Sequence, residues 1–174
     1  MLEKIVSGGQ TGVDRGALEA AMAAGIEYGG WVPKGRKAED GGVPEKFTAL
    51  REAPVAGYLW RTERNVIDSD ATLVLVPGDP SRLTPGSRRT VEFAKRHGKP
   101  VRISALKPDR LGMAAAAYWV DEGGYKVLNI AGPRESKHPG IQALAAECVS
   151  ILIDLFRDFD GERRRPPAPQ ASEA

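Results

Sequence analysis

The stretch KIVSGGQTGVDRGALEAAMAA, from Lys4 to Ala24, decides how the chain begins to fold. Its first residues are β-branched and apolar, whereas Val13 to Ala24 consists of good helix formers with apolar residues at helical spacing. The glycines between the two segments permit a tight turn. We therefore expect a strand, a glycine turn and a helix, in that order.

The same junction predicts an anion site. The first turn of a helix presents unpaired N–H groups and about half a positive charge, which favours phosphate. An ordinary strand-to-helix connection contains similar glycines, and this motif is neither the GxGxxG fingerprint nor a Walker loop. We expect backbone N–H groups of this turn to hold one phosphate, and the turn contributes six candidate site residues: Gly8, Gly9, Gln10, Thr11, Gly12 and Asp14.

Length and composition indicate one domain. The chain has 174 residues, 41% of them hydrophobic, and its apolar runs are too short to cross a bilayer. We expect a soluble, cytoplasmic protein with one domain over residues 1–159 and a disordered tail over residues 160–174, which is rich in Arg, Pro and Ala. The formal charge of +2 leaves no broad basic face for duplex nucleic acid, so no nucleic-acid partner is expected.

The remaining segments alternate between strand and helix patterns. The run ATLVLV at Ala71–Val76 is typical of a central strand buried on both faces. Alternation of this kind predicts an α/β fold with a mostly parallel sheet covered on both sides. Further strands are expected from Gly25 and at residues 55–60, 100–103 and 125–131. Helical turns are expected at residues 44–50, followed by a short helix that Thr62 caps. Longer helices are expected from about residue 85, at 110–120 and at 141–159.

Three other loops add candidate ligand contacts. A glycine-rich loop over residues 30–42 carries cations, and two glycine turns follow the strands ending at Val76 and Ala131. Loops at the carboxyl ends of parallel strands converge on one crevice. A solvated surface loop remains the alternative for the loop over residues 30–42, and a salt bridge to Glu135 or to a helix carboxylate remains the alternative for Arg134. The candidates are Lys34, Arg36, Gly86, Ser87, Arg88, Thr90, Gly132, Arg134, Glu135 and Ser136.

The sequence favours neither a thiol nucleophile nor a protein-bound metal. Cys148 is the single cysteine and falls on the apolar stripe of the last helix, so we expect a packed core thiol. His97 and His138 stand in no HxH or HxxxH arrangement. We therefore assign no catalytic residue and no metal ligand.

Several motifs, in order along the chain, resemble the molybdenum carrier protein family. They are Ser7–Arg15, Gly30–Arg36 with Ala38–Gly41, Arg61–Thr62 with Asn65–Val66 and Ser69–Asp70, and Asn129–Ser136. The family belongs to a superfamily of Rossmann-like nucleotide-binding domains that also holds the lysine-decarboxylase-like phosphoribohydrolases. The resemblance covers about residues 4–156.

The resemblance implies a Rossmann-like three-layer α/β/α fold, a homo-oligomer of two or four chains, and a pocket for a phosphate-bearing ligand. In the carrier reading the ligand is the molybdenum cofactor (molybdopterin), with the metal on its dithiolene. A nucleotide or ADP-ribose-like sensor is an alternative. A phosphoribohydrolase is another, but Glu92 stands one residue early for the motif PGGxGTxxE, which rotates its side chain by about 100° on a helix. A non-catalytic binder is therefore favoured, and enzymatic activity is left open.

Overall fold

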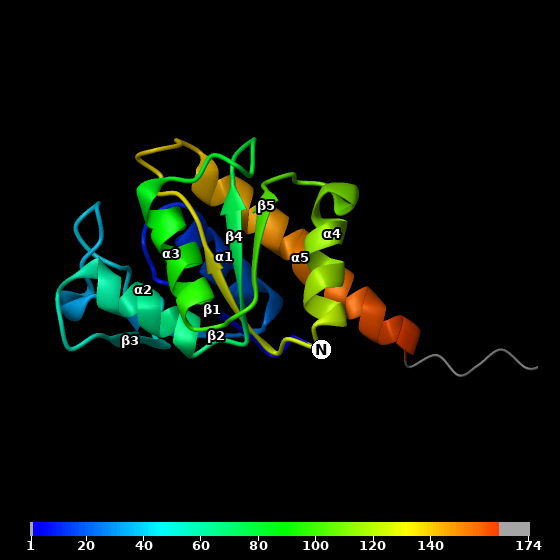
Figure 1. Ribbon diagram of the computed structural model, residues 1–174, viewed down its shortest axis with the longest axis horizontal. Coiled ribbons are helices and arrows are strands. Elements are labelled where there is room, and N and C mark those ends of the chain that lie inside the picture. The colour runs from blue at the N-terminus through cyan, green and yellow to red at the C-terminus, as the bar shows by residue number, and fades with distance from the viewer. Residues whose placement is uncertain (1, 164–174) are drawn as a thin grey trace, which may run out of the picture.

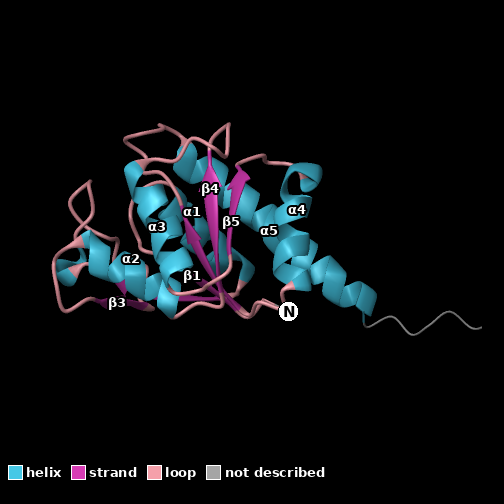
Figure 2. Cartoon of the chain, viewed as in Figure 1, coloured by secondary structure: helices cyan, strands magenta, loops and turns pink. Residues whose placement is uncertain are grey.

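A computed structural model describes residues 2–163 as a parallel sheet with helices on both faces (Figures 1 and 2). The expected three-layer α/β Rossmann-like fold is thereby confirmed. The strands are β1 (Lys4–Val6), β2 (Glu27–Val32), β3 (Leu50–Glu52), β4 (Ala71–Val76), β5 (Val101–Ala105) and β6 (Val127–Ala131); the helices are α1 (Val13–Ala24), the 3-10 turn η1 (Lys34–Arg36), α2 (Tyr58–Ile67), α3 (Pro85–Arg96), α4 (Arg110–Glu122) and α5 (Ile141–Arg163).

The sheet order is β3-β2-β1-β6-β4-β5, and every neighbouring pair is parallel. All six residues of β4 are buried, as expected for an apolar run that is covered on both faces. Strand β6, near the end of the chain, lies between β1 and β4. The loops that follow β1, β4 and β6 therefore meet at one edge of the sheet, which is the edge that positions the site.

Two layers of helices cover the sheet. The largest core cluster joins one face of the sheet to α1, α4 and α5, and Cys148 lies within it, fully buried. On the other face, Val66 of α2 packs with Phe93 and Ala94 of α3. Figure 1 shows α2 and α3 in front of the sheet and α1 and α5 behind it.

Three expectations about the secondary structure need correction. The strand expected at residues 55–60 is wrong, because helix α2 begins at Tyr58, directly after Gly57 in an extended conformation. Thr62 is not a helix cap; its hydroxyl donates to the Tyr58 carbonyl inside α2 at 2.8 Å. Leu50, expected to end the helical turns at 44–50, instead begins the edge strand β3.

The last helix is longer than expected. Helix α5 continues through residues 160–163, which had been assigned to the tail. The remainder of the expected tail, residues 164–174, lies outside the described residues.

Candidate functional site

A cavity of about 300 Å³ lies where the loops after β1, β4 and β6 meet the first turns of α2. It is an open cleft formed by residues from four separate parts of the chain. The lining residues are Gln10, Asp14, Tyr58, Leu59, Arg61, Thr62, Thr84, Pro85, Gly86, Arg89, Thr90, Ala131, Gly132, Pro133, Arg134 and Lys137.

The lining is strongly cationic. It holds three arginines and one lysine against a single carboxylate, that of Asp14. Arg89 pairs with Glu92 at 3.0 Å on the exposed side of α3. Within residues 2–163, Arg134 and Lys137 form no ion pair, so their charges are available to an anion in the cavity.

Asp14 and Arg61 form a buried ion pair in the wall of the cavity. The nearest atoms, Arg61 Nη1 and Asp14 Oδ2, are 3.4 Å apart, and the side chains are 12% and 7% exposed. Burial raises the pKa of Asp14 above its usual range, and the charge of Arg61 opposes the rise. Burial likewise lowers the pKa of Arg61. The long contact leaves both groups with unused hydrogen-bonding capacity.

Tyr58 holds two guanidinium groups beside the cavity. The Arg61 and Arg134 guanidinium carbons lie 5.8 and 4.9 Å from the centre of its ring, so the tyrosine stacks with both cations. Arg134 therefore packs on Tyr58, and the alternative of a salt bridge to Glu135 is not what the structure contains. Two guanidinium groups held beside one cavity provide positive charge and N–H donors for an anionic group.

Two buried donors among the lining residues have no protein partner. They are Nε of Arg61 and Nε2 of Gln10. The oxygen of the Gln10 amide accepts the N–H groups of Thr11 and Glu39, each at 3.0 Å, which leaves only its NH₂ group unused. Buried polar groups without partners are rare in folded proteins, and a bound ligand is one explanation for them.

The loops after β1 and β6 touch through their backbones. The N–H of Val13 donates to the Pro133 carbonyl at 3.2 Å. Gly12 has φ +85°, and a Cβ placed there would lie 2.4 Å from the Pro133 oxygen. Only glycine fits this contact, which holds Pro133 and Arg134 against the start of α1.

Comparison with known proteins places the chain in a family. The model of the circularly permutated YpsA SLOG family matches residues 5–153. The chain belongs to this SLOG family. The crystal structure of the "Putative molybdenum carrier protein" from Syntrophus aciditrophicus SB is similar, with 45% identity and a TM-score of 0.77 over 89% of this chain and 94% of that chain. None of the curated proteins matches the chain.

In this SLOG domain, the structure brings six of the expected site residues together in the cavity. The turns after β4 and β6 contribute their glycines, Gly86 and Gly132, to the lining, whereas the segment after β1 contributes Gln10 and Asp14. No heavy atom lies within 4 Å of a Cβ placed at Gly86, so a ligand can approach its backbone. The six residues are Gln10, Asp14, Gly86, Thr90, Gly132 and Arg134.

The first glycine turn differs from the expected phosphate cradle. The Thr11 N–H already donates to Gln10 Oε1, and the Gly12 N–H donates to Gln142 Oε1 at 3.4 Å. A Cβ at Gly9 would meet the apolar side chains of Val32, Val43 and Leu50. Gly8 adjoins Arg61 instead, because a Cβ there would overlap the guanidinium. Side-chain cations, rather than these backbone amides, dominate the lining.

The other expected residues have structural contacts outside the cavity lining. Arg36 donates to the carbonyls of Val43, Pro44 and Phe47 and so ties its own loop together. Lys34 and Arg88 are exposed, and Ser87 is buried at the start of α3, where its N–H and hydroxyl contact Thr84.

Three more of the expected residues, Thr11, Glu135 and Ser136, lie beside a separate hollow, and Glu39 binds two of them. Its carboxylate accepts the hydroxyls of Thr11 and Ser136 and the Ser136 N–H. Glu135 accepts the N–H groups of Gly140 and Gln142 at the start of α5. These contacts fasten the loop over residues 37–42 to the loops after β1 and β6.

Sequence reasoning missed most of the cationic lining. Tyr58, Arg61 and Thr62 lie on one face of α2 with spacings of three and four, and this helical stripe was the available signal. Because a strand was expected at residues 55–60, this helical spacing was not recognised. Arg89 lines the cavity in place of its neighbour Arg88. Apart from the charge of Lys137, nothing in the sequence indicated that this residue would line the cavity.

The geometry suits recognition of a small anion. Glu92 lies outside the lining and is half-exposed, paired with Arg89. Among residues 2–163 there is no cluster of three or more His, Cys, Asp or Glu side chains that could hold a metal ion. In the same part of the chain no helix is long and apolar enough to cross a membrane.

Proposed function

We propose that the cavity binds a phosphate-bearing small molecule through Arg61, Arg134 and Lys137. The observation that carries this proposal is the excess of fixed positive charge in the lining, together with the buried, unpartnered Nε of Arg61. An unpaired donor in such a site costs free energy that a phosphate oxygen would recover. Arg134 and Lys137 stand nearer the solvent and would complete the contact.

We propose further that the ligand is the molybdenum cofactor and that the protein carries it. The name of the 45% identical neighbour supports this reading, as do the motifs shared with the carrier family. The cofactor is then cargo, held by its phosphate and its pterin ring, with molybdenum on the dithiolene of the cofactor. Tyr58 and Leu59, at the edge of the cavity, offer the flat ring a surface.

A homo-oligomer that works in the cytoplasm is part of the same proposal. Two large apolar side chains of α4 face outward: Leu111 is 87% exposed and Tyr118 is 56% exposed. Exposed apolar surface of this kind is typical of contacts between subunits. Light scattering after gel filtration would measure the mass, and a monomer would contradict this part.

A thermal-shift panel tests the ligand class. The compounds are molybdenum cofactor, nucleoside monophosphates and ADP-ribose, each with its dephosphorylated counterpart as the control. At about 100 times Kd a ligand adds about 2.7 kcal/mol of stability, which corresponds to about 5 to 11 °C for a domain of this size. A shift by nucleotides alone would replace the carrier with a nucleotide sensor. No shift by any phosphate-bearing compound would refute the site.

Variants locate the binding. Arg134→Ala removes one charge-assisted contact, worth about 1.5 to 3 kcal/mol, so affinity should fall about 10- to 150-fold. Arg88→Ala is the matched control, because Arg88 is exposed on α3 and outside the lining. Equal affinities for the two variants would show that the ligand binds elsewhere. Base release from a nucleoside monophosphate would instead establish a hydrolase.

A further inference from the structure

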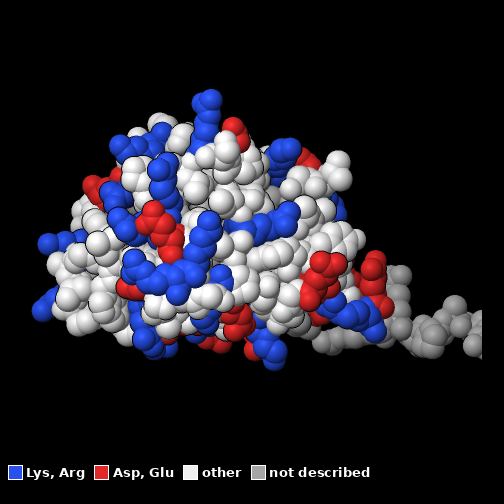
Figure 3. Space-filling model, viewed as in Figure 1, with Lys and Arg blue, Asp and Glu red and all other residues white. Residues whose placement is uncertain are grey.

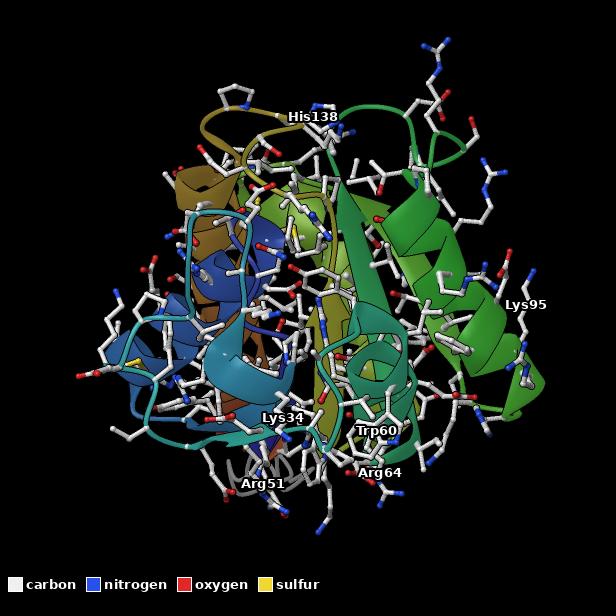
Figure 4. The ribbon with its side chains drawn as sticks, turned by 90° about the vertical axis from the view of Figure 1, so that its left-hand side faces the viewer. Lys34, Arg51, Trp60, Arg64, Lys95 and His138 are labelled. Carbon is white, nitrogen blue, oxygen red and sulfur yellow. The ribbon has the colours of Figure 1, made fainter. Side chains whose placement is uncertain are left out.

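A second hollow, of about 390 Å³, lies at the other end of α2. It shares no lining residue with the cavity described above. Figure 4 shows the separation: Arg51, Trp60 and Arg64 lie at the lower end of the molecule, and His138, on the loop after β6, lies at the upper end. The lining consists of Lys4, Val6, Gly29, Gly30, Trp31, Ala49, Arg51, Arg64, Asn65, Asp68 and Val127.

A missing side chain opens this hollow. Residues alternate between the two faces of a strand, so Gly29 and Trp31 of β2 share a face. Because Gly29 has no side chain, the floor beside Trp31 is open, and the Lys4 side chain runs across it, with its Cε 3.0 Å from a Cβ placed at Gly29. The last turns of α2 form the opposite wall, with Arg64 and Asp68.

Three cations from three different elements converge on the hollow. Lys4 comes from β1, Arg51 from β3 and Arg64 from α2. Lys4 pairs with Glu27 at 2.6 Å, and Arg64 pairs with Asp68 at 2.8 Å. Within residues 2–163, Arg51 forms no ion pair, and its guanidinium carbon lies 5.6 Å from the centre of the Trp31 ring. Arg51 is exposed and thus presents an uncompensated charge.

The walls that hold these cations are rigid. Trp31 and Arg51 are register partners in the parallel pair β2 and β3, so both side chains rise from the same face. The Trp31 ring packs edge-on against Trp60, with centroids 5.3 Å apart, and its Nε1 donates to Asp68 at 2.8 Å. Asn65 accepts the Trp31 N–H and donates to the Trp31 carbonyl, which fixes α2 against β2.

We propose that this hollow binds an acidic segment of a partner protein, whose carboxylate side chains contact Arg51 and Arg64. A guanidinium binds a carboxylate in a bidentate fork, and the contact of Arg51 with the Trp31 ring holds its guanidinium beside the hollow. Asp68 at the wall and the nearby Glu27 would repel the continuous phosphate backbone of a nucleic acid, whereas separate carboxylates can reach the cations one at a time. A protein docked here leaves the cavity at the far end of α2 open.

The face beside this hollow has the same sign of charge. Figure 3 shows Lys and Arg side chains gathered over α2 and α3, where they outnumber the acidic residues Glu63 and Glu92 that pair with Arg96 and Arg89. Such a field accelerates the approach of an acidic partner and weakens with added salt. The bound segment would therefore be held by local contacts at Arg51 and attracted over a longer range by the face as a whole.

Peptide binding to the full chain tests the proposal. The probe is a fluorescein-labelled peptide of eight glutamates, followed by fluorescence anisotropy at low and physiological salt. Arg51→Glu should weaken binding about tenfold or more. Lys95→Glu, the matched control, makes the same change of charge on the same basic face but on α3, away from Arg51 and Arg64 (Figure 4), and at physiological salt it should weaken binding less than about twofold. Equal weakening by both variants would mean that the peptide responds only to the overall positive charge of the protein, and this would contradict a specific binding site at the hollow.

A titration of the unaltered protein avoids any effect of substitution on folding. In a 15N-labelled sample the three tryptophans give separate indole N–H signals. The peptide should shift the signals of Trp31 and Trp60 and leave that of Trp119, which packs against Tyr125 on the other face, in place. Unmoved Trp31 and Trp60 signals at saturation, or tighter binding of a single-stranded DNA oligomer at the same signals, would contradict the proposal.

Discussion

Substitution of Gly12 tests the backbone contact that joins the two loops of the cavity. Gly12 has φ +85° and ψ −133°, a backbone conformation that residues other than glycine rarely adopt. In Gly12→Ala the added Cβ would lie 2.4 Å from the Pro133 carbonyl oxygen and 2.7 Å from the Glu135 nitrogen. Both contacts are with backbone atoms, so no side chain can rotate to relieve them.

The magnitude follows from three contributions. Strained backbone dihedrals cost about 1 to 3 kcal/mol. Real Cβ contacts stay above 3.0 Å, so the loop after β6 must move by at least the difference, 3.0 − 2.4 = 0.6 Å. That movement weakens the hydrogen bond from Val13 to Pro133, worth about 1 kcal/mol, and disturbs the packing around it. We expect a loss of about 3 to 5 kcal/mol and a fall in Tm of about 6 to 20 °C.

Gly140→Ala is the control for the dihedral alone. Gly140 has φ +88°, but no heavy atom lies within 4 Å of a Cβ placed there. Its cost should be about 1 to 2 kcal/mol. The assay is urea unfolding followed by circular dichroism, with Tm from calorimetry. If Gly12→Ala proves no more destabilising than Gly140→Ala, the close approach of the two loops is not as described.

Three further substitutions or reactions probe other parts of the structure. Burial raises the pKa of Cys148 to about 11, so its thiol should resist a disulfide reagent at pH 8 and react only after unfolding; rapid reaction of the native protein would contradict its burial. The hydrogen bond from Arg15 lowers the pKa of Asp40, so the stability that this pair contributes is fully present above about pH 3.8 and is lost as the pH falls through the lower pKa of the folded state. Asp40→Asn should therefore weaken the fall of the free energy of unfolding at acid pH, measured by urea unfolding, and an unchanged fall would argue against the pair. Asn65→Ala leaves two backbone groups of Trp31 without partners and should cost about 2 kcal/mol or more in the same assay, whereas a neutral result would mean that water replaces the amide.

The fold followed from local patterns wherever a segment had one strong periodicity. The run at Ala71–Val76 is apolar throughout and too short for a helix, so its burial in the centre of the sheet was predictable. The segment over residues 55–60 was not, since a few apolar and aromatic residues suit a strand and a helix equally. The helix begins after the extended Gly57, and the spacing of three and four between Tyr58, Arg61 and Thr62 favours a helix only when the window continues past residue 60.

The candidate site was predictable in position but not in composition. Loops after parallel strands meet at one edge, which correctly placed Asp14, Gly86 and Arg134 together. Sequence could not show that Arg36 would bind carbonyls of its own loop while Arg61 would be buried beside Asp14. Both residues are arginines on polar segments, and only the packing of α2 against the first loop separates their roles.

The central claim is that Arg61 and Arg134 hold the phosphate of a bound ligand. The most direct measurement is a crystal structure of the protein soaked with the compound that stabilises it most in the thermal panel. The account predicts phosphate density inside the cavity, with oxygens about 2.7 to 2.9 Å from both guanidinium groups. Density for the phosphate outside the cavity, with Nε of Arg61 still unpartnered, would contradict it.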